Sequence, residues 1–210
     1  MITIFYESHA TSVDNVAGRA SGHADVPLHE TGEVQAVEMG RRYRQTHLDA
    51  IFSSDLQRAY RTAEIAFAGR EIPLIKDSRL REVDYGDWTR WATDVIQAER
   101  SRRVAAPFPS GESYTQSSAR VRAFLSDLLR DHDGKTVLII GHRATHYGLE
   151  HGINGILLEE IVAERSPWIH GQVYHLRSEE ESHEMGDAKE RQGRSYRLPL
   201  AGAPLHQRRG

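Results

Sequence analysis

The sequence contains no cysteine, and this absence excludes several kinds of chemistry. Without a thiol, the chain cannot form disulfide bonds, use a thiolate nucleophile, or bind zinc or an iron–sulfur cluster through sulfur ligands. Histidine is abundant by contrast, with 12 among 210 residues. We therefore look for reactive groups among the histidines and among the arginines and carboxylates placed near them.

Long hydrophobic runs and a surplus of positive charge are also missing. No apolar stretch approaches the ~18 residues that span a membrane, and residues 1–6 lack the charged leader of a secretory signal. Lys and Arg number 27 against 30 Asp and Glu, so the formal charge of -3 provides no general attraction to nucleic acid or acidic lipid. We expect a cytoplasmic protein that binds neither a membrane nor nucleic acid.

The length of 210 residues and the hydrophobic share of 39% predict one folded domain with an insertion. The domain is expected to cover residues 1–176. Residues 88–113 carry two tryptophans and no clear strand, which indicates an insertion covering one end of the fold. Residues 177–210 form a polar tail with few apolar side chains, so we expect them outside the core, with disorder as one interpretation.

Short apolar runs alternate with amphipathic segments before this tail. Strands are predicted at 2–6, 50–53, 73–76, 136–141 and 171–176, and helices at about 31–46, 56–67 and 113–130. Thr31 and either Ser54 or Asp55 are expected to cap the first two helices. The run 136–141 is apolar throughout, as in a central parallel strand buried on both faces. The pattern predicts a three-layer α/β/α fold with a mainly parallel sheet.

Polar side chains that follow the predicted strands should meet at one edge of such a sheet. They are Ser8, His9, Thr11, Ser54, Arg58, Arg79, Arg81, Glu82, His142 and Arg143. A neutral imidazole is a nucleophile, a guanidinium binds phosphate oxygens in pairs, and a carboxylic acid can protonate a leaving oxygen. This combination suits phosphoryl transfer without a metal.

Some of these residues have plainer interpretations. Glu82 could form salt bridges with Arg79 or Arg81. The spacing of His142, His146 and His151 resembles a metal-binding helix face, but no further ligand at a fitting interval completes a tetrahedral set, so we expect no metal. The tryptophans and tyrosines are interpreted as core or lid packing, and the arginine runs 100–103 and 208–209 as solvated faces.

Six short segments in chain order carry a recognisable pattern between residues 2 and 176. They are Ser8-His9-Ala10 with Thr11, Ser12 and Asn15; residues 22–36, with Gly22, Asp25 and Pro27; Ser54 to Ala59 with Thr62; Leu80-Arg81-Glu82 with Gly86-Asp87-Trp88; Pro109 to Ser113; and Gly141-His142. Together they resemble the histidine phosphatase superfamily, in its phosphoglycerate-mutase-like branch. The resemblance implies a phosphoglycerate-mutase-like fold with a helical insertion over the site.

The resemblance also implies a two-step mechanism that needs no cofactor. His9 would attack the phosphorus and form a phosphohistidine, while Glu82 would protonate the leaving alcohol and later activate water. Arg58 and His142 would hold the phosphoryl oxygens, and Asn15 would add a further hydrogen bond.

The first motif departs from the family pattern. Ser8 stands where the family keeps an arginine, and Ala10 where it keeps glycine. Without the arginine, charge-assisted hydrogen bonds of ~1.5–3 kcal/mol each would be missing. Glu7 would add a negative charge nearby unless a cation pairs with it. Arg143 is a candidate replacement and is counted with Ser8 in the phosphate site. Two further candidates are Arg61 and Arg19.

The favoured hypothesis is a phosphohydrolase for a small phosphorylated metabolite that carries a phosphomonoester. A mutase is less favoured, because the longer chain and more basic pocket typical of mutases are missing. The alternative is a divergent member that catalyses a non-phosphatase reaction or acts as a ligand-binding module, with Ser8 as its main support. Since the other motif residues are present, the enzyme hypothesis is preferred. The substrate is not predicted, and a homodimer is left open.

Overall fold

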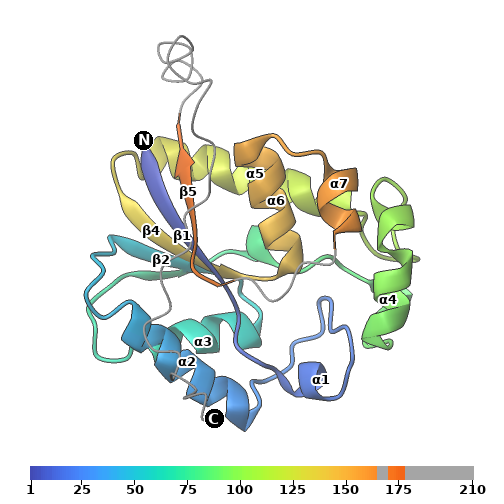
Figure 1. The fold of residues 1–210 in the computed structure, drawn as a ribbon, viewed down its shortest axis with the longest axis horizontal. Coiled ribbons are helices and arrows are strands. Elements are labelled where there is room, and N and C mark those ends of the chain that lie inside the picture. The colour runs from blue at the N-terminus through green and yellow to red at the C-terminus, as the bar shows by residue number, and fades with distance from the viewer. Residues whose placement is uncertain (165–169, 178–210) are drawn as a thin grey trace, which may run out of the picture.

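The computed structural model describes residues 1–164 and 170–177, and these residues form one mixed sheet of five strands between two layers of helices (Figure 1). The strand order is β3-β2-β4-β1-β5. Neighbouring strands are parallel except for β5, which runs antiparallel to β1. The helices α5 and α6 cover one face, and α2 and α3 cover the other. The predicted three-layer α/β/α fold is therefore confirmed.

The strands are β1 Ile2–Ser8, β2 Ala50–Ser53, β3 Leu74–Lys76, β4 Thr136–Gly141 and β5 Gln172–Leu176. The α-helices are α1 Val13–Val16, α2 Glu30–Arg42, α3 Gln57–Ala66, α4 Thr93–Glu99, α5 Tyr114–Asp131, α6 Arg143–Asn154 and α7 Leu158–Ala163. Three short 3-10 helices complete the described chain: η1 Ser78–Leu80, η2 Gly86–Trp88 and η3 Arg100–Arg103. All five predicted strands are present. The predicted tail 177–210 lies outside the described residues apart from Arg177.

The helix starts differ from the predicted caps. His29 caps α2 in place of Thr31, because its Nδ1 accepts a hydrogen bond from the Thr31 backbone N–H at 3.3 Å. Two backbone N–H groups at the start of α3 donate to side chains. The Leu56 N–H donates to Ser54 Oγ, and the Gln57 N–H donates to the carboxylate of Asp25, which is distant in sequence. Asp55 is not a cap, since its carboxylate pairs with an arginine.

Three helices, α1, α6 and α7, were not predicted. In α6, the interior glycines Gly148 and Gly152 lower the helix propensity of the segment. Gly148 lies where an added Cβ would come within 2.5 Å of the Val121 side chain, so the glycine allows α6 to pack closely on α5. Residues 88–113 contain α4 and η3, which agrees with the predicted helical insertion. Across the described residues, no helix combines the length and apolar character needed to cross a membrane.

Three clusters of buried side chains hold the layers together. One lies between the sheet and α5, a second between the sheet and α2 and α3, and a third beneath the insertion. The third is rich in aromatic rings, as the packing interpretation of the tyrosines predicted; Tyr85, Tyr114 and Tyr147 are buried in it. Trp88 packs against this cluster, whereas Trp91 stacks on Trp88 and is 44% exposed.

The carboxyl ends of the two central strands position the candidate site. Ser8 lies opposite Gly141 in the parallel pairing of β1 with β4, so the residues that follow each strand emerge side by side. The Tyr6 hydroxyl donates to the His142 carbonyl at 2.6 Å, and the His9 backbone N–H donates to the Gly141 carbonyl at 3.0 Å. The two loops are therefore fixed to each other where they leave the sheet.

Candidate active site

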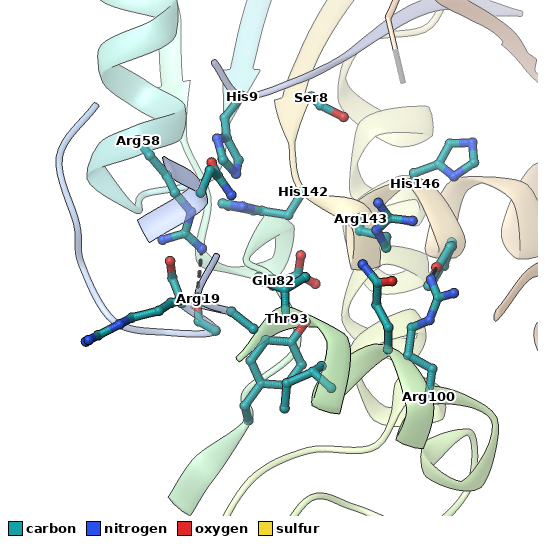
Figure 2. A pocket seen from close by; sticks show the side chains of 18 residues that line it. Ser8, His9, Arg19, Arg58, Glu82, Thr93, Arg100, His142, Arg143 and His146 are labelled. Carbon is teal, nitrogen blue, oxygen red and sulfur yellow. Dashed lines mark hydrogen bonds between the residues drawn. The ribbon is translucent and has the colours of Figure 1, made fainter. Parts of the chain in front are cut away.

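A cavity of about 120 Å³ opens at this edge of the sheet (Figure 2). It is lined by the seven residues assigned to the site from the sequence: Ser8, His9, Asn15, Arg58, Glu82, His142 and Arg143. Four other residues expected at this edge do not line it: Thr11, Ser54, Arg79 and Arg81. Of the seven, Ser8 ends β1, and the others lie in α1, α3 and α6 or just after β1, η1 and β4. The fold thus brings together residues up to 135 positions apart in sequence, from Ser8 to Arg143. Their chemical roles remain predictions.

His9 is held in the form that a nucleophile requires. Its Nδ1 lies 2.7 Å from the Ala10 carbonyl oxygen, which can only accept, so Nδ1 carries the proton and Nε2 carries the lone pair. The side chain is buried, and burial together with the charge of Arg58 lowers the pKa of His9 to about 3. The imidazole is therefore neutral at physiological pH, and its Nε2 carries the lone pair that a base or nucleophile needs.

His142 lies against His9, with the ring centroids 4.9 Å apart and the rings inclined at 58°. Its main chain is anchored at both ends of the residue, because its N–H donates to Thr145 Oγ1 and its carbonyl accepts from Tyr6. Within residues 1–164 and 170–177, neither ring nitrogen has a hydrogen-bond partner. Burial and the nearby Arg58 hold the pKa of His142 well below its usual value. Such a buried N–H is suited to donating to an anionic oxygen in the cavity.

Arg58 supplies positive charge beside both rings. It lies in the first turn of α3 and is only 2% exposed. Its NH1 and NH2 groups donate to the carbonyls of Ala24 and Gly22, at 2.9 and 2.8 Å. Burial lowers the pKa of Arg58, and the negative charge of Glu82 opposes this effect. Because the guanidinium is fixed by backbone carbonyls, its charge is oriented toward the cavity before any ligand arrives.

Glu82 lies at the same cavity, next to the start of α6. Its Oε1 accepts from the backbone N–H groups of Val83 at 2.9 Å and Ala144 at 3.1 Å. The salt-bridge alternative is wrong: Arg79 pairs with Asp77 and Asp127, and Arg81 pairs with Asp55. The Glu82 carboxyl group is instead held by main-chain donors at the cavity wall.

The remaining candidates contribute unequally. Asn15 uses its carboxamide oxygen to accept from the Ser12 N–H and hydroxyl, so its NH₂ group is the part that can donate to a ligand. Arg19 and Arg143 line the cavity, whereas Arg61 does not and pairs with Glu64.

Glu7 does not add an unpaired charge to this site. Its fully buried carboxylate accepts from Tyr43 and Arg42 at 2.9 and 3.2 Å. A cation therefore pairs with it, as the sequence argument required.

The opposite end of the cavity is formed by the insertion. It is lined there by residues from α4 and η3, which are Thr93, Ile96, Gln97 and Arg100. The interpretation of residues 100–103 as one solvated face is wrong for Arg100, which is 6% exposed and donates to the Tyr147 hydroxyl at 2.9 Å. Arg102, by contrast, is 79% exposed. The four-residue spacing from Ile96 to Arg100, one helical turn, is the sequence signal that could have identified Arg100.

His146 also lines the cavity. From the sequence it was a candidate only for a metal-binding helix face. It is buried and lies 3.4 Å from a Glu150 carboxylate oxygen. In the part of the chain that the structure describes, no group of three or more His, Asp or Glu side chains is arranged to hold a metal ion.

Comparisons with known proteins identify the family to which the chain belongs. A sequence profile of the histidine phosphatase superfamily (branch 1) matches residues 8–185. Phosphoserine phosphatase 1 of Hydrogenobacter thermophilus is 35% identical over 151 residues, covering 68% of this chain and 71% of the relative. The 2,3-bisphosphoglycerate-dependent phosphoglycerate mutase of Rhizobium etli is 32% identical over 198 residues, covering 85% and 93%. The solved structure of Bacillus stearothermophilus YhfR superposes with a TM-score of 0.73 at 29% identity, covering 85% of this chain and 96% of that one. This chain belongs to the histidine phosphatase superfamily, branch 1.

Proposed function

We propose that this protein is a phosphohydrolase that releases phosphate from a small organic phosphomonoester through a phosphohistidine on His9. The observation that carries the proposal is the arrangement of His9, His142 and Arg58. A neutral imidazole with its lone pair on Nε2 lies 4.9 Å, ring to ring, from a second buried imidazole, and a fixed guanidinium lies beside both. This set provides a nucleophile together with positive and hydrogen-bonding groups for phosphoryl oxygens.

In the first step, His9 Nε2 attacks the phosphorus and the bond from phosphorus to the alcohol oxygen breaks. Glu82, in its acid form, gives its proton to that oxygen, so a neutral alcohol leaves. In the second step, the Glu82 carboxylate takes a proton from water, and the water oxygen attacks the phosphorus. The bond from phosphorus to Nε2 then breaks and inorganic phosphate is released. Arg58 and His142 stabilise the phosphoryl oxygens in both steps.

Supporting positions come from the rest of the cavity. Asn15, Ser8 and Arg143 are proposed to bind the phosphoryl group or the adjoining part of the substrate, since all three line the cavity. Ser8 is the departure from the family pattern. A divergent non-phosphatase reaction or a ligand-binding role is the alternative that its presence supports.

A mutase is the second candidate, because the Rhizobium etli phosphoglycerate mutase matches 85% of this chain. A mutase and a phosphatase share the first step and differ in the acceptor, which is a hydroxyl group for the mutase and water for the phosphatase. The test is the conversion of 3-phosphoglycerate to 2-phosphoglycerate with 2,3-bisphosphoglycerate present, compared with phosphate release from the same mixture. Isomerisation that is faster than phosphate release would replace the phosphohydrolase assignment.

The main experiment measures phosphate release from a panel of phosphomonoesters, with EDTA present and no added metal. Wild-type protein is compared with His9→Ala and with His47→Ala, a control whose imidazole is 82% exposed and outside the cavity. We expect release by wild type and His47→Ala and none by His9→Ala. Release that persists in His9→Ala, or no release by the wild type from any substrate, would contradict the proposal.

A further inference from the structure

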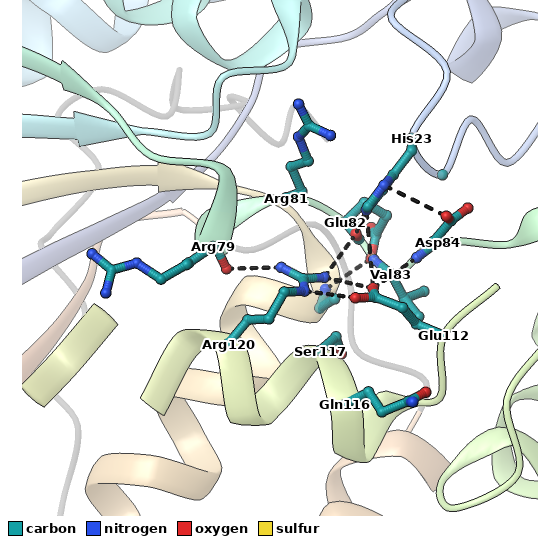
Figure 3. Close-up of polar contacts among 12 residues, drawn as sticks. His23, Arg79, Arg81, Glu82, Val83, Asp84, Glu112, Gln116, Ser117 and Arg120 are labelled. Atoms are coloured by element: carbon teal, nitrogen blue, oxygen red, sulfur yellow. Dashed lines mark hydrogen bonds and ion pairs between the residues drawn. The ribbon is translucent and has the colours of Figure 1, made fainter. Parts of the chain in front are cut away.

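Residues 22–24 connect the arginine of the cavity to the loop that carries Glu82. The carbonyls of Gly22 and Ala24 accept the two hydrogen bonds that fix Arg58. Between them, the His23 side chain extends in another direction, and its Nε2 lies 2.8 Å from the Glu82 carbonyl oxygen (Figure 3). A carbonyl can only accept, so His23 Nε2 carries the proton and donates it. One tripeptide therefore binds both Arg58 and the main chain of Glu82.

The Glu82 carbonyl is held from a second side by α5. Arg120 NH2 donates to it at 3.2 Å, and Arg120 also binds both carboxylate oxygens of Glu112, at 2.8 and 2.7 Å. Glu112 in turn accepts from the Asp84 N–H at 3.1 Å. These contacts tie the Glu82 loop to α5, whereas His23 ties it to the residues that hold Arg58. The two anchors thus come from different parts of the fold.

Direct packing adds to the hydrogen bond between these two loops. Gly22 has a φ of +52°, and a Cβ added there would lie 2.9 Å from Tyr85 Cδ2 and 3.2 Å from the Tyr85 nitrogen. A larger residue is excluded by both the backbone conformation and the space. The segment 22–24 therefore lies directly against the residues that follow Glu82.

His23 keeps this hydrogen bond whether or not the imidazole is protonated, because Nε2–H is present in both forms. The charged groups facing the ring are the carboxylates of Asp84, 3.7 Å from Nδ1, and Glu112, 4.0 Å from Nε2, together with the Arg120 guanidinium that pairs with Glu112. The ring is about a quarter exposed and is not part of the cavity wall. It cannot touch a substrate bound there, so any effect on the reaction must pass through another residue.

We propose that His23 is a positioning residue. It fixes the position of the acid Glu82 relative to the phosphate-binding Arg58. This inference rests on the proposed function, because it assigns Glu82 the proton that reaches the leaving oxygen. Removal of the His23 side chain leaves the carbonyl contacts of Arg58 in place, since these are made by the backbone. It frees the Glu82 loop on one side. The proton transfer is then weakened, while the attack on phosphorus is retained.

The leaving group distinguishes this role from a general structural one. An alkoxide such as the one from propyl phosphate needs a proton to leave, whereas 4-nitrophenolate leaves without one. The measured quantity is kcat/KM, which reports the step in which the alcohol departs. We expect His23→Ala to lower kcat/KM about 10-fold for propyl phosphate and less than about 2-fold for 4-nitrophenyl phosphate. His23→Gln should restore the first value, because its amide nitrogen can donate from nearly the same position as Nε2.

Glu82→Gln separates failure of this inference from failure of the proposed function. We expect it to show a larger loss with the same dependence on the leaving group, and to be affected little by adding His23→Ala. If Glu82→Gln shows this pattern but His23→Ala lowers both substrates equally, lowers neither, or is not rescued by His23→Gln, the inference is wrong and the proposed function stands. If Glu82→Gln lacks the pattern, the acid role fails and the inference falls with it. Melting temperatures of all variants check that each protein is folded.

Discussion

The two ends of the active-site cavity are built in different ways. The histidine end is formed at the carboxyl ends of β1 and β4 and the first turn of α3, and the main chain there is tied together across the fold. Examples are the hydrogen bonds from the His9 N–H to the Gly141 carbonyl and from the Ala10 N–H to Thr62 Oγ1. The reacting side chains thus stand on the most deeply buried strands of the sheet.

The other end is formed by the insertion, which lies outside the sheet. Side-chain packing there adds to main-chain hydrogen bonds such as the one from the Arg90 N–H to the Ala20 carbonyl at 2.7 Å. The Trp88 ring lies edge-on to Phe108 at 5.8 Å, and the Arg103 guanidinium lies 4.9 Å from the Trp88 centroid. Four lining residues come from this layer, on α4 and η3. A change there can alter the room for the alcohol part of a substrate and leave the histidines in place. We therefore propose that the chemistry and the choice of substrate are carried by separable parts of the molecule.

Removal of the nucleophile tests the histidine end most severely. His9→Ala should lower phosphate release by on the order of 10³-fold or more, because the proposed covalent intermediate forms on His9 Nε2. The measurement is rapid-quench labelling with a ³²P-phosphomonoester, followed by a test for a bond that is labile in acid and stable in base. Wild-type protein should be labelled and His9→Ala should not. Equal labelling of both would move the nucleophile away from His9.

Replacement of the fixed guanidinium is the second test of this end. Arg58→Lys keeps the charge but loses the paired contacts with the Gly22 and Ala24 carbonyls, so we expect turnover to fall about 10²-fold. Arg61→Lys, three residues along the same helix, is the matched control, because Arg61 pairs with Glu64 at the surface. The measurement is the initial rate of phosphate release together with the melting temperature. If the two lysine variants had equal activity, Arg58 would have no part in holding the phosphoryl group.

This contrast also explains which features could be predicted from the sequence. The strands β1 and β4 were predicted because a run of apolar residues has one stable place, inside the sheet. Residues that follow such strands must meet at its carboxyl edge, so His9, Glu82 and His142 could be grouped before the structure was known. For the histidine end, strand patterns and topology grouped these three residues, whereas Asn15 was selected only through the resemblance to the family.

The insertion end was less predictable, since its arrangement depends on contacts between distant side chains. Arg100 was interpreted as part of a solvated face, but Tyr147 on α6 provides a partner that makes its burial favourable. The helix α6 itself was missed because Gly148 and Gly152 lower its helix propensity, and both lie against the α5 side chains Val121 and Leu125. The positioning contact of His23 likewise joins residues 59 positions apart, and no local signal in the sequence indicates it.

The pH dependence of the unfolding free energy provides a further test of the histidine end. His9 has a pKa lowered to about 3 by burial and by Arg58, and burial lowers that of His142 as well. The unfolded chain therefore binds more protons as the pH falls below the usual histidine value of about 6.5, and the folded state loses up to about 1.4 kcal/mol per pH unit for each of the two residues. This stability is fully present above about pH 6.5 and is lost as the pH falls toward the folded-state values.

Urea unfolding between about pH 7.5 and 4.5 measures this effect. Below about pH 6.5, His9→Gln should reduce the slope of the unfolding free energy against pH by up to about 1.4 kcal/mol per pH unit. This corresponds to a change of up to about tenfold per pH unit in the unfolding equilibrium constant. The exposed His47→Gln should leave the slope unchanged. Carboxylates that titrate in the same range contribute equally to all three proteins, so the difference between them reports His9 together with its effect on the neighbouring His142. An unchanged slope in His9→Gln would mean that His9 takes up its proton over the same pH range in the folded protein as in the unfolded chain.

The smallest effect is expected at the insertion end. Gln97 lies on α4, lines the cavity and is exposed to the space where the alcohol part of a substrate would sit. Gln97→Ala removes one polar contact, so we expect kcat/KM to change about 3-fold for substrates with a large polar alcohol and to stay the same for 4-nitrophenyl phosphate. The exposed Gln45→Ala is the control, because Gln45 lies outside the cavity wall. A uniform loss across all substrates would show that α4 also supports the histidines, and the two ends would then have to be treated as one unit.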